Sequence, residues 1–174
     1  QMEDLSNFMS DKFGYATGPW ENFDALSESK KFLARLDWNV NDNNKVTLRY
    51  VHHDSSSDVL TSNSTSAGNG NRTAQVNAMS YKNSGYVIQD NTRSIVLEVN
   101  SKLSEKWSNT FIGGYDIQIE DRGLQGGGLF PTVDIRNGSA TAATLISLGL
   151  DPFTNGNKLD YSTLHFTDNV TANF

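Results

Sequence analysis

The sequence contains no cysteine, so it can form neither a disulfide nor a thiolate metal site. It has only three prolines, and no apolar run approaches the roughly 18 residues that a transmembrane helix requires. Basic residues are scarce as well: 14 Lys and Arg against 20 Asp and Glu give a formal net charge of -6. An acidic chain argues against a nucleic-acid partner, because binding to phosphates needs a basic face.

What the chain does contain is a repeated pattern of strand, short turn, strand and long loop. One predicted strand pair turns at Asn41-Asp42-Asn43-Asn44 and the next turns at Ser104-Glu105-Lys106. Long polar stretches, 54–91 and 123–160, separate and follow these hairpins, and residues 1–29 have the same character. Since a hairpin reverses the chain, the short turns belong at one end of a sheet and the long loops at the other. That asymmetry is typical of an outer-membrane β-barrel.

Five strands are predicted from period-two alternation, near 30–40, 45–53, 92–103, 107–122 and from Tyr161 onward. In the first of them Phe32, Leu36 and Trp38 share an apolar face, and Arg35 and Asp37 lie on the opposite, mostly polar face. In a soluble protein such an apolar face packs on a core, whereas in a barrel it faces lipid and the polar face lines the lumen. The fold class expected is all-β: antiparallel strands of a transmembrane β-barrel with long extracellular loops that carry short helices.

The alternation also assigns candidate residues to each face. Trp38 and Trp107 lie close to the short turns, where an interfacial aromatic girdle is expected. Asp168 is the exception, a charge on the otherwise apolar face of the last strand, expected near a membrane boundary or at a bulge. The charges predicted to face the lumen are Arg35, Asp37, Arg49, Glu98, Lys102, Asp116 and Glu120. The loop aromatics that are candidates for contact with a ligand, or for packing the loops together, are Trp20, Tyr81, Tyr86 and Phe130.

Outside the strands, three short elements are expected. Leu5, Phe8 and Phe13 follow helical spacing, with Asp4 as the expected N-cap and Gly14 as the stop. A short strand is expected at 132–136, and one or two helical turns at 140–150.

No catalytic or metal site emerges, and no cofactor is expected. In His52-His53-Asp54 the two imidazoles point to opposite faces of a strand, so they cannot share one ion without a bulge. Carboxylates suited to calcium lack the spacing of a calcium loop; they are Asp116, Glu120, Asp121 and Asp134. There is no G-x-S-x-G elbow, and the glycine run 126–128 has no following lysine or helix to make a phosphate loop. We therefore expect the chain not to be an enzyme.

Several segments together carry a family resemblance. The hairpin Lys31-Phe32-Leu33-Ala34-Arg35-Leu36-Asp37-Trp38-Asn39-Val40-Asn41 followed by Lys45-Val46-Thr47-Leu48-Arg49-Tyr50 resembles a barrel hairpin of the Oar-like TonB-dependent receptors. Further segments resemble the same family in the same order: 4–8, 83–86, 97–101, 130–135, 149–153 and 167–171. Each motif alone is weak, but together they span essentially the whole chain.

The resemblance implies a large outer-membrane protein of a Gram-negative bacterium, with a plug and a 22-stranded barrel, that imports a scarce solute. Its implied partners are outer-membrane lipid, the TonB system acting through the plug, and a surface lipoprotein as a candidate. About five strands cannot close so large a barrel. The chain begins at Gln1, shows no signal peptide and stops at Phe174 within a predicted strand, so residues 1–174 are expected to be a partial barrel segment without plug or energy-coupling residues.

Two other interpretations remain open at this stage. The chain could be a soluble or surface-exposed β-sandwich that binds glycan or protein, in which case the apolar faces would be buried between two sheets. A glycan-active enzyme would need paired carboxylates across a cleft, which the sequence cannot establish.

Overall fold

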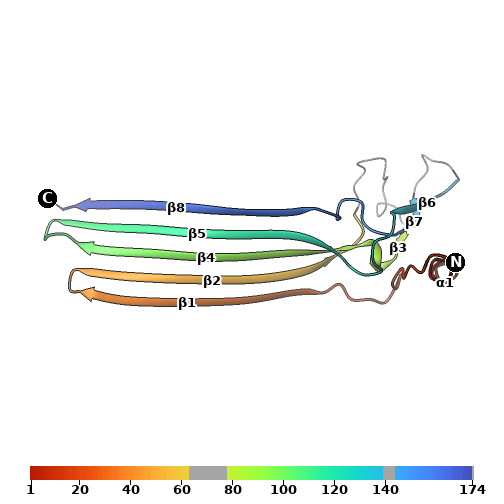
Figure 1. The fold of residues 1–174 in the computed structure, drawn as a ribbon, viewed down its shortest axis with the longest axis horizontal. Coiled ribbons are helices and arrows are strands. Elements are labelled where there is room, and N and C mark those ends of the chain that lie inside the picture. Colours follow the sequence, from red (N-terminus) through yellow and green to blue (C-terminus); the bar gives the residue numbers. More distant parts are fainter. Residues whose placement is uncertain (63–77, 139–143, 174) are drawn as a thin grey trace. The chain divides into compact units, whose positions relative to one another are not determined.

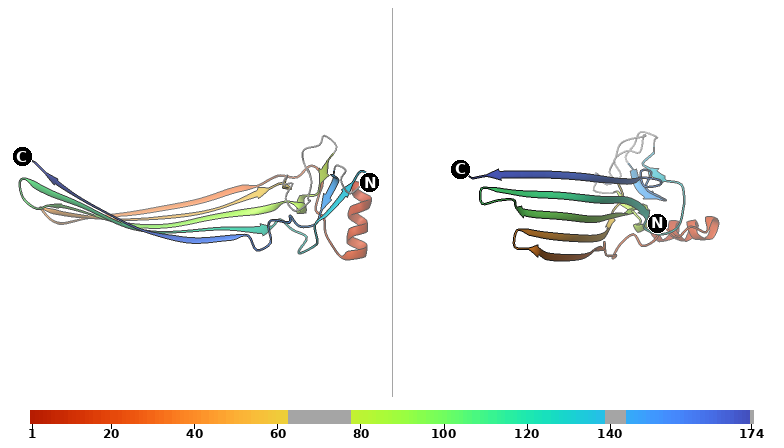
Figure 2. Two further views of the ribbon diagram at one scale, coloured as in Figure 1. Left: turned by 90° about the horizontal axis from the view of Figure 1, so that it is seen from above. Right: turned by 60° about the vertical axis from the view of Figure 1, so that its left-hand side comes forward.

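In the computed structural model the described residues are 1–62, 78–138 and 144–173, and they are mostly antiparallel β-strand. Five long strands form one sheet in the order β1-β2-β4-β5-β8, which Figure 1 shows as neighbouring arrows. Their bounds are Ser27–Asn41 (β1), Asn44–Val59 (β2), Tyr86–Lys102 (β4), Trp107–Leu124 (β5) and Lys158–Ala172 (β8). The all-β prediction is confirmed, and the strands twist along their length as Figure 2 shows.

Both predicted hairpins are present. The turn between β1 and β2 is stabilised by Asn41, whose side-chain oxygen accepts hydrogen bonds from the Asn43 backbone N–H at 3.0 Å and from the Asn44 side chain at 2.9 Å. In the turn between β4 and β5, the Ser104 hydroxyl accepts from the backbone N–H groups of Lys106 and Trp107 at 3.3 and 3.2 Å. Asparagine and serine favour turns because their side chains can replace backbone partners in this way.

The chain forms two compact units. The first, which we call the loop unit, comprises Gln1–Glu28, Ser56–Gln89 and Asp121–Lys158. The second, the sheet unit, comprises Ser29–Ser55, Asp90–Glu120 and Leu159–Phe174. β2 and β4 extend beyond their predicted ends, so the connection between them is shorter than the sequence pattern indicated.

The loop unit contains helix α1, Met2–Phe13, and a small three-stranded sheet in the order β3-β7-β6. In that sheet Met79–Ser80 (β3) runs parallel to Thr144–Leu148 (β7), and Val133–Arg136 (β6) runs antiparallel to β7. A single 3-10 turn, η2, spans Lys82–Ser84. The unit's buried apolar side chains are Met2, Met9, Tyr15, Tyr81 and Leu148.

Two details of the loop unit differ from the sequence prediction. The N-cap of α1 is Gln1, and Asp4 lies inside the first turn, where its negative charge still suits the positive end of the helix dipole. The prediction of helical turns at 140–150 is wrong for the residues that the structure describes there, because Thr144–Leu148 form strand β7. The neighbouring strands β3 and β6 pair with β7 on either side. The Gly14 stop is confirmed: its φ is +62°, and its N–H bonds the last carbonyls of the helix.

Candidate functional site

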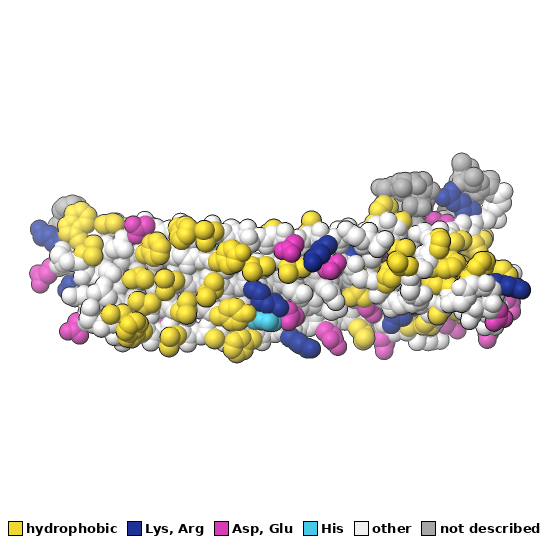
Figure 3. Space-filling view, in the orientation of Figure 1, with side chains coloured by type: hydrophobic (Ala, Val, Ile, Leu, Met, Phe, Trp, Pro, Cys, Tyr) yellow, Lys and Arg dark blue, Asp and Glu magenta, His cyan; other side chains and the backbone are white. Residues whose placement is uncertain are grey.

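The sheet unit exposes most of its apolar side chains on one face. Leu36 in β1 is 64% exposed and Phe166 in β8 is 65% exposed, although a soluble core would bury both. Other exposed members of this face are Phe32, Trp38, Val40, Leu48, Ile95, Leu97, Trp107, Tyr115, Leu164 and Val170. Figure 3 shows these yellow side chains gathered over the five strands, with few charges among them. We call this surface the apolar face.

The end of the apolar face nearest the short turns is marked by tryptophan. Trp38 is 61% exposed and Trp107 is 46% exposed. At the same level Asp168 accepts a hydrogen bond from the Asn109 side-chain nitrogen at 2.7 Å. Asp168, a charge among the apolar side chains of the last strand, is therefore hydrogen-bonded within two residues of Trp107.

The opposite face carries cross-strand polar pairs, and we call it the polar face. Asp37 accepts two hydrogen bonds from Arg35, at 2.8 and 2.9 Å, and a third from the Thr47 hydroxyl at 2.7 Å. Arg49 approaches Glu98 at 3.6 Å across β2 and β4. Four of the charges predicted to face the lumen thus pair with one another, Arg35 with Asp37 within β1 and Arg49 with Glu98 between β2 and β4.

This polar network continues into β5 and β8. Glu98 accepts from the Asn100 side chain at 2.8 Å, and Asn100 accepts in turn from the Thr110 hydroxyl at 2.8 Å. Further along, Asp116 lies 3.3 Å from His165 Nδ1. Three groups of charged and amide side chains, spread over five strands, suit a surface that faces water or another polar element.

Two consecutive glycines in β5 lie on opposite faces, and we expect alanine to affect them differently. At Gly113 an added Cβ would lie 3.3 Å from a Phe166 ring carbon, so Gly113→Ala needs only a slight adjustment. At Gly114 an added Cβ would overlap the His165 ring and push it away from Asp116. Gly114→Ala is therefore expected to destabilise the protein by at least about 1 kcal/mol more than Gly113→Ala in a denaturant titration, and equal effects would contradict this packing.

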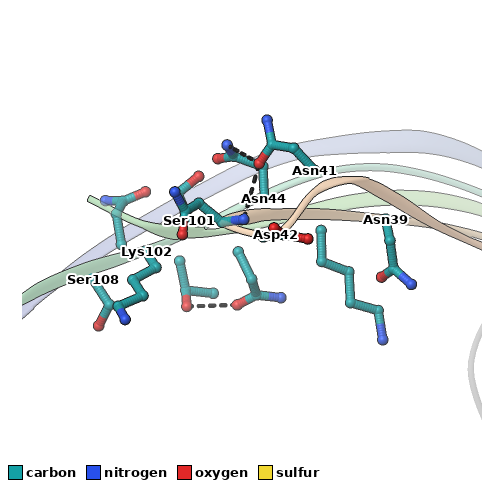
Figure 4. Close-up of a pocket in the computed structure, with 12 residues that line it drawn as sticks. Asn39, Asn41, Asp42, Asn44, Ser101, Lys102 and Ser108 are labelled. Carbon is teal, nitrogen blue, oxygen red and sulfur yellow. Dashed lines mark hydrogen bonds between the residues drawn. The ribbon is translucent and has the colours of Figure 1, made fainter. Parts of the chain in front are cut away.

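A polar pocket of about 660 Å³ lies beside the short turns. Its lining includes the side chains of Asn39, Asn41, Asn44, Lys45, Lys102 and Ser108, most of which Figure 4 labels. Lys102, predicted to face the lumen, is part of this lining. The pocket offers amide, hydroxyl and ammonium groups, which can bind a polar or anionic surface but supply no nucleophile with an adjacent base.

The apolar face ends, away from the turns, in a polar group that we call the border cluster: Tyr50, His52, Asp54 and Arg93. Tyr50 Oη lies 3.2 Å from His52 Nδ1, and His52 Nε2 lies 2.8 Å from Asp54 Oδ2. Arg93 Nη2 donates to Asp54 Oδ1 at 2.6 Å. Figure 3 shows charged side chains following the yellow surface here.

The histidine pair separates as the strand pattern predicted. His52 belongs to the border cluster, while His53 Nε2 lies 3.0 Å from the Ser29 hydroxyl. Within residues 1–62, 78–138 and 144–173, no three His, Asp or Glu side chains gather closely enough to hold a metal ion. Asp134, considered above as a calcium ligand, instead accepts a hydrogen bond from Ser147 at 2.8 Å.

The loop aromatics serve largely as packing groups. Tyr81 is 1% exposed and its hydroxyl donates to the Met2 carbonyl, so its ring has no surface to offer a solute. Phe130 stacks on Tyr15 with ring centroids 4.3 Å apart, and Trp20 packs against the same core. Tyr86 lies under the Arg122 guanidinium, 5.5 Å from its ring centroid. The burial of Tyr81 favours loop packing over ligand contact, the two roles that the sequence left open.

Comparisons with known proteins add no family assignment. No protein-family model, no curated protein and no solved structure matches this chain. Among the described residues no helix is both long and apolar enough to cross a membrane.

Proposed function

We propose that this chain forms part of the wall of an outer-membrane β-barrel, in a TonB-dependent receptor that imports a scarce solute into the periplasm. The observation that supports this proposal is the exposed apolar face of the sheet unit. Contiguous apolar surface beyond a few hundred Å² is rare on a soluble monomer and indicates a partner. Lipid is a partner that can cover such a face along its whole length.

The dimensions of the apolar face agree with this assignment. On β1 it extends from Phe32 to Val40, which matches the roughly 9–11 residues of a transmembrane β-strand. Trp38 and Trp107 occupy one boundary and the border cluster occupies the other. In a barrel, tryptophan and tyrosine mark the two interfaces between lipid and water.

The polar face supplies the second argument. Arg35, Asp37, Arg49 and Glu98 all lie on this face, opposite the apolar side chains. A barrel whose outer surface is apolar presents such charges to its lumen, where water or a plug can pair with them. In the proposed receptor these side chains line the path of the solute or hold the plug.

The two edge strands of the sheet have backbone groups available for pairing with further strands. β1 and β8 each have a neighbour on one side only among the described residues. Long unpaired edges promote aggregation, and closing the sheet into a barrel removes them. We infer that other strands of the same receptor pair with β1 and β8. The receptor class itself rests on the resemblance of the hairpin 31–50 and the six shorter segments to Oar-like proteins.

A soluble β-sandwich that binds glycan or protein is the alternative function. A sandwich would bury the apolar face between two sheets about 10 Å apart. The exposure of Leu36 and Phe166, at 64% and 65%, favours the barrel over this alternative.

The experiment that tests the proposal is fractionation of native membranes with an antibody against residues 1–174. We expect a band far larger than this 19.2 kDa chain, in the outer-membrane fraction, that migrates faster when the sample is not heated. Heat-dependent migration reports a closed, detergent-resistant barrel. A band of the chain's own size in a soluble fraction would overturn the proposal and favour the β-sandwich.

A further inference from the structure

The apolar face is not flat but contains a groove over Gly113. A depression of about 300 Å³ is lined by side chains that surround this glycine, among them Leu48, Leu97, Phe111 and Phe166. Because Gly113 has no side chain, it forms the floor of the groove, and the bulky residues on either side form the walls. The lining is almost entirely apolar, so the groove suits a hydrocarbon chain.

The groove leads to a cation. A second depression, of about 170 Å³, is lined by Tyr50, Arg93, Ile95, Tyr115 and Ile117. It shares Ile95 and Tyr115 with the depression over Gly113. The two are therefore neighbouring parts of one groove, which begins over Gly113 and reaches the aliphatic part of the Arg93 side chain.

Arg93 is held in a fixed orientation at that end. Its Nη1 donates to the backbone carbonyls of His53 and Thr92, at 3.0 and 2.9 Å, and its Nη2 donates to Asp54 at 2.6 Å. A guanidinium has five N–H donors, so these three bonds leave donors for a further acceptor. A planar guanidinium that is already oriented is well suited to a phosphate, which it can bind through two parallel hydrogen bonds.

The surroundings of Arg93 match an anionic headgroup at a lipid interface. Asp54 offsets part of its charge, while Lys30 lies on the same face of β1 as Phe32 and adds a positive charge to this end of the apolar face. Tyr50 and Tyr115 flank the end of the groove, and tyrosine is enriched where lipid meets water.

We propose that this groove is a binding site for a phosphate-bearing lipid, with an acyl chain over Gly113 and the phosphate at Arg93. This inference rests on the proposed membrane location and deepens it, because it assigns a specific lipid class to one part of the apolar face. A zwitterionic lipid gains the contact with the groove but also carries a positive group next to Arg93, so it binds less tightly.

The test is native mass spectrometry of the detergent-purified protein titrated with phosphatidylglycerol and with phosphatidylcholine of the same acyl chains. We expect phosphatidylglycerol to bind about tenfold more tightly, because phosphatidylcholine offers the same phosphate but brings a quaternary ammonium next to the Arg93 guanidinium. Arg93→Gln removes this preference, whereas Gly113→Leu fills the groove and weakens both lipids. Two matched controls are expected to leave the affinity for both lipids unchanged. Lys106→Gln removes a positive charge at the short turns, and Gly123→Leu enlarges a strand glycine that has open space around it.

Glycerol 3-phosphate distinguishes a lipid site from a site for free phosphate. We expect it not to displace phosphatidylglycerol, because it lacks the acyl chain that occupies the groove. Full displacement, equal binding of the two lipids, or unchanged binding by Arg93→Gln and Gly113→Leu would overturn the inference. Heat-dependent migration of each variant is measured in parallel. A folded, outer-membrane protein without lipid preference would contradict this inference alone and leave the proposed function standing.

Discussion

Replacing Leu36 by arginine is expected to destabilise the membrane-embedded protein by about 2–4 kcal/mol, the cost of an Arg at the bilayer midplane on the outside of a barrel. Leu36 lies midway along the apolar stretch of β1, between Phe32 and Val40, and is 64% exposed. An arginine side chain at this position would lie in lipid and would lose the hydration that stabilises its charge in water. The measurement is the free energy of unfolding by denaturant in lipid vesicles, together with the amount of heat-sensitive barrel in the outer membrane.

The same strand offers a closely matched control. Leu33 is 65% exposed and lies on the polar face, so Leu33→Arg makes the same chemical change at the same exposure. We expect Leu33→Arg to change the free energy of unfolding little, because on this face of the strand the new charge stays in water. Equal effects of the two substitutions would show that both faces meet the same solvent, and the barrel assignment would fail.

Replacing Tyr81 by alanine is expected to destabilise the loop unit by about 3–5 kcal/mol, as for other large buried aromatic residues. Tyr81 is 1% exposed, and its hydroxyl bonds the Met2 carbonyl at the start of α1. Tyr81→Phe keeps the ring and is expected to cost about 1–3 kcal/mol, because it leaves that carbonyl without its donor. Hydrogen exchange of the amides of α1 and β7 measures the free energy of opening.

The control for this series is Tyr161→Ala, at a half-exposed tyrosine of the sheet unit. It is expected to leave the exchange of α1 unchanged, and unchanged exchange in Tyr81→Ala would contradict the packing described.

Burial also raises the pKa of Tyr81, and of Tyr15 despite the opposing backbone hydrogen bond from Gly149. The neutral phenols thus stabilise the fold fully below about pH 10, and this contribution is lost as pH rises through the raised pKa values.

The long strands were predictable from sequence because each carries two independent signals. In 30–53, period-two alternation defines two strands and the asparagine run 41–44 defines the turn between them. The segment 140–150 lacked such signals. Its small and apolar residues suit either a helix or a buried strand, and partners distant in sequence, Met79–Ser80 and Val133–Arg136, decide the outcome. Asp4 illustrates a smaller error, since a capping residue and a first-turn acid look alike in sequence.

The candidate site was predictable only at the level of faces. Alternation placed Arg35, Asp37, Arg49 and Glu98 on one surface, where the structure pairs them. The groove over Gly113 and the role of Arg93 were missed, because both depend on which residues of β2, β4 and β5 lie opposite one another. One sequence signal does point to Arg93. It follows the same alternation as Ile95 and Leu97, which indicates a positive charge at the border of the apolar face.

Residues 1–174 contain no cysteine, so a single cysteine introduced here reports on this segment, and the receptor without the added cysteine supplies the background. Leu33→Cys and Leu36→Cys are compared by labelling native outer membranes, opened to admit a small membrane-impermeant maleimide on both sides. In the chain itself the two positions are equally exposed, at 65% and 64%. The barrel account predicts that Leu33→Cys is labelled through the aqueous lumen and that Leu36→Cys is protected by lipid until detergent and denaturant are added. Equal labelling of both cysteines before denaturation would contradict it.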